Sequence, residues 1–403
     1  MSNSVPKTRR DRLNALMINT VEVTKRGADR IRGGHLWIYR SDVVEAKAAG
    51  GAVVLVRDPK GKVVGRALYS DRSEITLRFL TQSEEAIDRE WWRQRIRAAA
   101  ARRDRLTVQT DACRLVYAEG DLLPSLVIDR YGDVLVLQTL SQGTEVAKQM
   151  LMALLVEEFG PRAIVERNDV AVRKLEGLEL VRGTLYGSPP DDLEVIQNGV
   201  RFVVAPLSGQ KTGLFLDQRE NYLAARELAR GRALDCFTFN GGFALHLASK
   251  CESVLGLDVS ADALAGAARN AALNGRSNVE FREANVFDAL REFESAGERF
   301  DTIVLDPPAF AKNRASVKTA LRGYKEINLR ALKLLRPEGV LVTCSCSHHM
   351  SEEMLLAVLS DAATDARRKL QLIEKRTQAG DHPILMSMPE TYYLKCLIAR
   401  VVG

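Results

Sequence analysis

Short runs rich in valine, isoleucine and leucine recur through residues 20–80 of the chain. The runs TVEVTK, GAVVLVRD, KVVGRALYS and EITLRFL are separated by glycine and polar residues at regular intervals. Runs of this length and composition are typical of half-buried strands. They predict a small β-barrel or sandwich. Residues 1–18 show no such pattern, and we expect them to form a loosely ordered polar leader.

A helical pattern follows the predicted barrel. In residues 83–106, Trp92, Ile96 and Ala99 are spaced for one buried stripe, and arginines occupy the other faces. A second helix is expected near 143–158. Strand-like runs surround it and predict a small α+β unit. These runs cover residues 114–121, 125–132, 134–140 and 163–169.

From about residue 190 onward, strand-like and helix-like runs alternate. This order is typical of a doubly wound parallel sheet, so the predicted fold class is α/β with a Rossmann-like domain at the C-terminal end. The pattern divides the chain into a leader, a β-barrel domain, a central α+β domain and the Rossmann-like domain. The predicted boundaries are 1–18, 19–90, 91–188 and 189–403.

Polar side chains stand at the expected carboxyl ends of four successive strands in this last domain. Asp235 precedes the glycine turn at Gly241, Asp258 ends a strand-like run, Asn285 follows the third strand and Asp306 begins DPPAF. A single such residue often only caps a helix, but four in order indicate a ligand site. The dinucleotide fingerprint G-x-G-x-x-G is absent. The acids therefore favour an amine-bearing ligand at Asp235 and a ribose at Asp258.

Two cysteines, Cys344 and Cys346, lie one residue apart where the apolar run GVLVT ends. Their C-x-C spacing differs from that of zinc ribbons, and no second cysteine pair supplies further ligands, so we predict no metal site. The six cysteines of the chain form no disulfide framework, which indicates a reducing cytoplasm. A thiol at the substrate edge of the sheet is then available as a nucleophile.

Positive charge is concentrated in the first 110 residues. They carry 23 Lys and Arg against 13 Asp and Glu, a net charge of +10 in a chain whose total is +6. This imbalance favours an anionic polymer as a partner, although a basic surface without a partner has the same composition. No apolar run approaches the roughly 18 residues of a membrane span, so no membrane partner is expected.

The segment RIRGGHLWIYRSDV combines aromatic and basic side chains. Read as a strand, it places its aromatic residues on one face beside arginines, an arrangement that can stack bases and grip phosphates. The same aromatic rings can instead fill the core of a small barrel. The predicted RNA-binding residues of this domain are Lys25, Arg32, His35, Trp37 and Arg40.

The runs LDCFTFNGGFALHLA, VLGLDVS, ANVFDAL and VLDPPAF together resemble class I S-adenosylmethionine-dependent methyltransferases. With QKTGLFLDQREN, SCS at 345–347 and the barrel-like start, the chain from about residue 20 is similar to bacterial large-subunit (23S) ribosomal RNA cytosine-C5 methyltransferases that carry an N-terminal PUA domain. The resemblance implies a PUA domain, a small central domain and a Rossmann-like catalytic domain. It also implies S-adenosylmethionine as cofactor and 23S rRNA as partner.

The resemblance assigns roles by position. Asp235 and Gly241 would line the methionine end of the cofactor and Asp258 would hold the ribose hydroxyls. Asn285 stands where the family usually has an acid that touches the adenine amine, and its amide oxygen can accept the same hydrogen bond. The residues implied for the cofactor site are Lys211, Phe215, Arg219, Asp235, Phe237, Gly241, Asp258, Asn285, Asp306 and Pro307.

Methylation at C5 of cytosine requires a nucleophile that first adds to C6 and pushes electrons into the ring. Side chains two residues apart share a face of a strand, so periodicity does not choose between Cys344 and Cys346. The family pattern implies Cys346, the cysteine between two serines, with Cys344 as a buried apolar residue. Asp306 would hydrogen-bond the N3/N4 edge of the base. His348 and His349 are nearby, and the base that removes the C5 proton is unassigned.

Two other functions fit parts of the pattern. DPPAF also resembles the loop of methyltransferases that act on exocyclic base amines, for which no thiol is needed. A non-catalytic RNA-binding or ribosome-assembly factor would need neither the strand-end acids nor the glycine turn. A monomer and a homodimer are equally compatible with the sequence.

Overall fold

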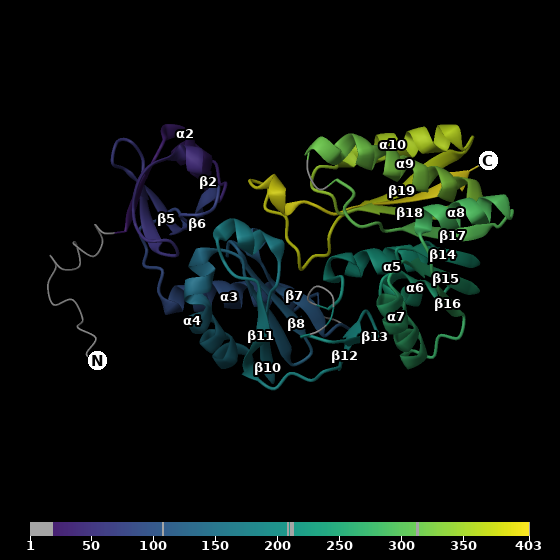
Figure 1. Cartoon of the computed structure of the whole chain (residues 1–403), viewed down its shortest axis with the longest axis horizontal. Helices are drawn as coiled ribbons and strands as arrows, with labels where there is room; N and C mark the ends of the chain where they lie inside the picture. The colour runs from purple at the N-terminus through teal and green to yellow at the C-terminus, as the bar shows by residue number, and fades with distance from the viewer. Residues whose placement is uncertain (1–18, 107–108, 208, 210–212, 312–313, 403) are drawn as a thin grey trace.

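The computed structural model describes residues 19–402 except 107–108, 208, 210–212 and 312–313, and the leader expected over residues 1–18 lies outside this range. The first unit is a six-stranded sheet in the order β2-β6-β5-β4-β1-β3, with one helix against it (Figure 1). Its elements are β1 (Thr20–Val23), α2 (Lys25–Arg32), β2 (Trp37–Tyr39), β3 (Val43–Lys47), β4 (Val53–Arg57), β5 (Val63–Tyr69) and β6 (Ile75–Thr81).

Helix α2 corrects one expectation from the sequence. Arg30 and Arg32 lie on this helix and not on the strand that carries Trp37. The helix begins because the side chain of Thr24 accepts a hydrogen bond from the backbone N–H of Gly27, which is a normal N-cap. Ile31 points into the core of the unit, whereas Arg30 is half-buried and Arg32 is exposed.

The central unit is a five-stranded sheet in the order β11-β10-β9-β8-β7, covered by two helices. The stripe predicted on α3 is correct, since Trp92, Ile96 and Ala99 are all buried. The elements are α3 (Arg89–Arg103), β7 (Ala112–Tyr117), β8 (Leu126–Tyr131), β9 (Val134–Thr139), α4 (Gln142–Phe159), β10 (Ala163–Asn168) and β11 (Val181–Gly187).

A separate hairpin follows, where continuous alternation of strands and helices was expected. Strands β12 (Leu193–Gln197) and β13 (Val200–Val204) pair only with each other in the described chain. Asn198 and Gly199 both have positive φ, at 54° and 77°, which is the geometry of a tight two-residue hairpin turn. The hairpin packs Val195 between the central and C-terminal units.

The C-terminal unit has a seven-stranded sheet in the order β16-β15-β14-β17-β18-β20-β19. Six strands run in the same direction, and β20 runs antiparallel between β18 and β19. The elements are α5 (Arg219–Leu228), β14 (Arg232–Cys236), α6 (Gly242–Leu247), β15 (Ser253–Asp258), α7 (Ala261–Leu273), β16 (Val279–Glu283), α8 (Val286–Ser295), β17 (Phe300–Leu305), α9 (Val317–Leu334), β18 (Leu335–Ser345), α10 (Glu352–Asp365), β19 (Lys369–Arg376) and β20 (Lys395–Val402).

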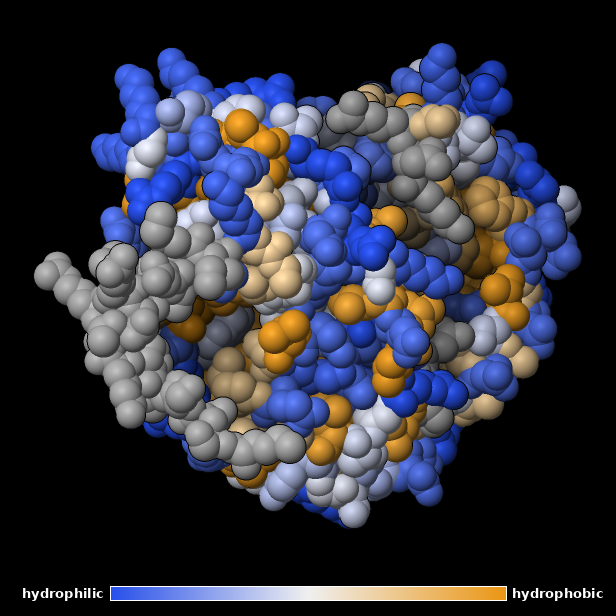
Figure 2. Space-filling model, turned by 60° about the vertical axis from the view of Figure 1, so that its left-hand side comes forward, coloured by the Kyte–Doolittle hydropathy of each residue, from blue (hydrophilic) through white to orange (hydrophobic). Residues whose placement is uncertain are grey.

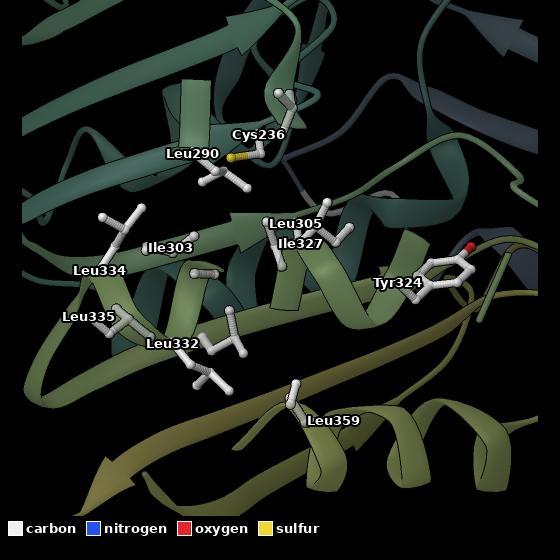
Figure 3. Packing of buried hydrophobic residues seen from close by; sticks show 14 of the residues in the cluster. Cys236, Leu290, Ile303, Leu305, Tyr324, Ile327, Leu332, Leu334, Leu335 and Leu359 are labelled. Atoms are coloured by element: carbon white, nitrogen blue, oxygen red, sulfur yellow. The ribbon is translucent and has the colours of Figure 1, made fainter. Parts of the chain in front are cut away.

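One large apolar cluster holds this sheet to helices α8, α9 and α10 (Figure 3). Ile303 and Leu305 of β17 pack against Ile327 of α9, and all three side chains are fully buried. Tyr324 of α9 lies at the end of the cluster, with its hydroxyl pointing away from the apolar side chains. This packing fixes the carboxyl ends of the parallel strands relative to α9.

The segment between β19 and β20 leaves the sheet and reaches the other two units (Figure 1, yellow). Met388 is fully buried in the core of the N-terminal unit, and the hydroxyl of Ser387 donates a hydrogen bond to the backbone oxygen of Gly34. Asp381 receives hydrogen bonds from the backbone N–H of Arg114 at 2.9 Å and from the guanidinium of Arg219 at 3.0 Å. The segment therefore ties all three units together.

The face seen in Figure 2 is mostly hydrophilic, with hydrophobic side chains in small separate groups. In the part of the chain that the structure describes, no helix is both long enough and apolar enough to cross a membrane.

We expect Asp381→Asn to destabilise the protein by about 3 kcal/mol at neutral pH, because Arg219 would lose its buried carboxylate. Burial alone would raise the pKa of Asp381, but His382 and Arg219 outweigh it and lower this pKa to about 2. The folded pKa lies below the unfolded value of about 3.9. The stabilisation is thus complete above that value and is lost as the pH falls through about 2.

Thermal melts of the wild type and Asp381→Asn between pH 2 and pH 7 measure this effect, and the two melting temperatures should converge at low pH. Asp361→Asn on the exposed face of α10 is the matched control and should leave the melting temperature unchanged. Equal stability of wild type and Asp381→Asn at pH 7 would contradict the assigned role.

Candidate active site

Asp235 lies at the carboxyl end of β14 and is buried. Its Oδ2 atom accepts hydrogen bonds from the hydroxyl of Thr238 at 2.6 Å and from the backbone N–H of Ala244 at 2.9 Å. Within the described chain, its Oδ1 atom is buried and accepts no hydrogen bond. Burial raises the pKa of this carboxyl to about 7. A buried oxygen with an open acceptor position suits the amino group of a ligand.

The loop after Asp235 has an unusual backbone. Phe237 and Phe239 have positive φ of 65° and 50°, and Gly241 at 87° begins helix α6. Such conformations cost free energy in residues with side chains and gather at ligand sites. A Cβ atom at Gly242 would lie 2.5 Å from the hydroxyl oxygen of Tyr222, so only glycine fits there. The turn brings backbone close to the strand end.

Asp258 connects this loop to the next strand. Its Oδ2 atom accepts the backbone N–H of Phe239 at 2.9 Å and its Oδ1 atom accepts that of Ser260 at 3.0 Å. Each carboxylate oxygen keeps a further acceptor position for a ribose hydroxyl. Asn285 is exposed and its side-chain oxygen caps helix α8 by accepting the N–H of Phe287. The structure brings Asp235 and Asp258 together through the loop and leaves Asn285 at the rim.

The residues of the segment QKTGLFLDQREN that were predicted to bind the cofactor lie in different surroundings. The ring of Phe215 meets that of Phe239 edge to face, with ring centroids 5.0 Å apart, so Phe215 borders the loop. Arg219 is buried elsewhere, in ion pairs with Asp381 and Glu220, so we assign it to holding the units together and not to the cofactor. Lys211 lies outside the described residues.

Asp306 and Cys346 meet at the ends of adjacent strands. Oδ1 of Asp306 accepts a hydrogen bond from the side-chain nitrogen of Gln218 at 3.0 Å. The thiol of Cys346 donates a long hydrogen bond, with sulfur and oxygen 4.0 Å apart, to the backbone oxygen of Pro307. Cys346 is half-buried and follows the last residue of β18. The thiol and the carboxylate therefore border the same edge of the sheet.

Cys344 has a different environment. It is fully buried, opposite Cys396 of β20, in an apolar cluster. Burial raises the pKa of its thiol, and Cys396 adds to this effect. A thiol of that kind is a poor nucleophile. The environment favours Cys346 where strand periodicity could not choose.

Three residues that the sequence analysis did not single out hold this edge in place. The hydroxyl of Tyr324 is 2.9 Å from that of Ser345 and 3.2 Å from that of Ser347, so it braces both neighbours of Cys346. Nζ of Lys395 donates to the backbone oxygen of Ser347 at 2.8 Å. Gln218, which holds Asp306, lies within the segment QKTGLFLDQREN. No local sequence pattern indicates that Tyr324 and Lys395 lie at this edge.

The residues predicted to bind RNA in the N-terminal unit are partly engaged within the protein. Trp37 donates its indole N–H to Glu119 of the central unit at 3.0 Å, and His35 faces Glu390 of the C-terminal segment at 3.4 Å. These two aromatic side chains therefore join units. The correction has a simple cause, since strand alternation shows which residues share a face but not what covers that face.

The basic residues of the group differ among themselves. Arg32 forms an ion pair with Asp58 at 2.6 Å, and Arg40 donates to the backbone oxygen of Ser73 at 3.2 Å. Lys25 is exposed at the first position of α2. Lys25, Arg32 and Arg40 are all exposed, as a phosphate contact requires.

A cavity of about 470 Å³ lies between the central and C-terminal units. Tyr393, which borders it, packs its ring 5.6 Å from that of His348, two residues beyond Cys346. Arginine, aromatic and acidic side chains all face the cavity. The lining residues include Arg114, Arg167, Asp169, Phe215, Asp217, His382 and Tyr393.

Comparison with known proteins agrees with this arrangement. Residues 178–397 match the S-adenosylmethionine-dependent methyltransferase family and residues 21–82 match the PUA-like domain family. The fold resembles a putative methyltransferase from Streptococcus mutans, with a TM-score of 0.81 at 17% identity over 95% of this chain and 100% of that one. A second solved structure, a putative methyltransferase complexed with SAH, gives 0.82 at 18% identity over the same shares.

Curated relatives cover nearly the whole chain. The protein named Ribosomal RNA large subunit methyltransferase I from Tolumonas auensis is 43% identical over 96% of this chain and 100% of its own length. The protein of the same name from Shewanella amazonensis is 44% identical over 91% of this chain and 95% of its own length. The chain belongs to the S-adenosylmethionine-dependent methyltransferases with a PUA-like domain, in the family of Ribosomal RNA large subunit methyltransferase I. The predicted fold class and the cofactor, S-adenosylmethionine, are thereby confirmed.

We expect Asp258→Ala to weaken S-adenosylmethionine binding more than about tenfold, the effect of one lost charge-assisted hydrogen bond. Titration calorimetry of the full chain measures it. Asp262→Ala, which removes an exposed acid four residues away, is the matched control and should bind normally. Unchanged affinity in Asp258→Ala would refute the ribose assignment.

Proposed function

We propose that this protein methylates C5 of a cytosine in large-subunit (23S) ribosomal RNA, with Cys346 as the nucleophile. The position of Cys346 carries this proposal: it is a half-buried thiol at the carboxyl edge of the sheet, next to the loop that begins at Asp306. The names of the relatives support the ribosomal RNA substrate. We propose the cytoplasm as the place of action, where free thiols persist.

The cofactor site proposed here uses residues whose contacts suit the parts of S-adenosylmethionine. Asp235 would hold the amino group through its open oxygen, and Asp258 would hold the ribose hydroxyls. Asn285 would lie near the adenine. When bound, S-adenosylmethionine supplies an electrophilic methyl group. The proposed binding residues are Phe215, Phe237, Gly241, Asp235, Asp258, Asn285, Asp306 and Pro307, with Lys211 as a further prediction outside the described residues.

The protein's own residues would act on the cytosine as follows. The thiolate of Cys346 forms a bond to C6, and the electrons of the C5–C6 double bond move onto C5. Gln218 holds Asp306 in place. Asp306 hydrogen-bonds the N3/N4 edge of the base and helps the ring absorb the negative charge that the thiolate adds. After C5 carries the methyl group, loss of its proton breaks the bond between sulfur and C6 and returns the thiolate. The cavity beside Tyr393 offers room for a nucleotide turned out of its stack.

Methylation of an exocyclic amine fits the structure less well. In that chemistry the aromatic residue of the DPPAF loop stacks on the base. Phe310 instead packs against Tyr324, with ring centroids 4.8 Å apart, and also contacts Phe237 and Phe287. An aromatic ring packed against three others and partly buried is less available to stack on a base, so this packing favours the thiol mechanism.

The key prediction is that RNA with 5-fluorocytosine at the target position traps the enzyme in a covalent adduct with Cys346. Fluorine cannot leave C5 as a proton does, so the bond to sulfur persists. Cys346→Ala should abolish both trapping and methylation while S-adenosylmethionine binding is retained. Denaturing gels and peptide mass spectrometry detect the adduct.

Cys344→Ala is the matched control for this experiment. It should keep trapping and methylation and cost about 1 kcal/mol of stability for a small buried side chain. Methylation by Cys346→Ala at a near wild-type rate would rule out the thiol mechanism and restore the exocyclic-amine alternative.

For the N-terminal unit, we propose that exposed basic side chains hold RNA through phosphates. Lys25→Gln should reduce the slope of log affinity against log salt by about 1 and weaken binding to all RNA sequences alike. Filter binding at several salt concentrations measures the slope. Lys375→Gln, at an exposed site on β19 of the C-terminal unit, is the control. An unchanged slope in Lys25→Gln would show that this lysine contacts no phosphate.

A further inference from the structure

Lys395 is a buried lysine next to the proposed nucleophile. It is the first residue of β20 and pairs with Ser345, the last residue of β18, so the strand ladder ends one residue before Cys346. The residue is only 2% exposed. Its Nζ atom donates to the backbone oxygens of Ser347 at 2.8 Å and of Tyr393 at 2.7 Å. One ammonium hydrogen is thereby directed to the backbone next to Cys346, and another to the backbone just before β20.

Among the described residues, no carboxylate forms an ion pair with Lys395. Burial lowers the pKa of Lys395 to about 8, and within the described chain the charged group that raises it is the thiolate of Cys346. The ring of Tyr392 lies 5.9 Å from Nζ and adds a weaker attraction. An unpaired buried ammonium is costly, so a neighbouring group that can become an anion stabilises it.

The other polar groups around Cys346 do not supply positive charge. Asp306 at the end of β17 is an acid. Tyr324 on α9 already bonds to both flanking serines, and burial raises the pKa of its hydroxyl. Burial lowers the pKa of His348, which favours the neutral ring, and His349 follows it on the same loop. Among the described residues, Lys395 is therefore the cation next to the strand end that carries the thiol.

We propose that Lys395 activates Cys346 as an ammonium ion that lies beside the thiol and stabilises the thiolate formed when the thiol loses its proton. This proposal rests on the proposed function, in which Cys346 is the nucleophile. Lys395 acts through Cys346 and is a positioning residue, since its contacts are with the protein and not with the substrate.

The proton and the electrons balance through the cycle. The bond between sulfur and hydrogen breaks, the proton passes to solvent, and the electron pair stays on sulfur beside the ammonium of Lys395. That pair then forms the bond to C6. When this bond breaks after methylation, the pair returns to sulfur and again faces the ammonium of Lys395. The net proton released in the reaction comes from C5.

The rate of Cys346 alkylation by iodoacetamide, measured against pH in the full chain without RNA, tests the proposal. All five other cysteines are buried, so peptide mass spectrometry can follow Cys346 alone. Lys395→Met, which keeps the length of the side chain, should lower the rate at pH 7 at least tenfold and move the profile to higher pH. Lys395→Arg should stay within about threefold of the wild type. Lys375→Met, on the adjacent strand β19, removes an exposed charge as the control.

A wild-type alkylation profile in a Lys395→Met protein that still binds S-adenosylmethionine would overturn the proposal. Should that variant fail to fold, the wild type decides the matter: below pH 7 its Cys346 must react at least tenfold faster than a short peptide containing SCS, and equal rates would overturn the proposal. If the proposed function is wrong, Cys346→Ala will still methylate RNA. That result differs from a wild-type alkylation profile in Lys395→Met, so the two failures are distinguishable.

Discussion

The buried carboxylate of Asp381 is the contact on which the arrangement of the three units depends. It lies in the segment between β19 and β20 and accepts hydrogen bonds from Arg219 of the C-terminal unit and from the backbone of Arg114 in the central unit. The backbone oxygen of Asp381 accepts a further hydrogen bond from Arg103 of α3 at 2.7 Å. Because a buried ion pair is costly to break, these contacts hold the central sheet against the catalytic one.

The segment between β19 and β20 also shapes the active site. After the segment returns, β20 inserts between β18 and β19 in the antiparallel direction, so its first residues lie beside the last residues of β18. A parallel strand would present its carboxyl end at this edge. The antiparallel strand presents its beginning instead, with Lys395 next to Cys346 and Tyr393 next to the cavity. The topology thus brings a cation to an edge otherwise rich in acids.

The sequence predicted much of the fold because strand and helix periodicity are local properties. The strand-end acids were predictable for the same reason, since carboxyl ends of parallel strands meet at one edge. The hairpin at Asn198 was missed although its Asn-Gly turn is a local signal. The contacts of Arg219, Trp37 and Lys395 could not be predicted, because their partners lie far away in the chain and periodicity says nothing of what covers a face.

Trp37 and His35 contact other units of the protein, and this limits how the N-terminal unit can bind RNA. Side chains held by Glu119 and Glu390 are not available to stack on bases. They fix the basic unit at a set distance from the catalytic edge, and Met388 in its core does the same. A unit fixed in this way can grip phosphates only where the RNA backbone passes at that distance from a target cytosine. Shape of the RNA, more than its sequence, would then determine which cytosine reaches Cys346.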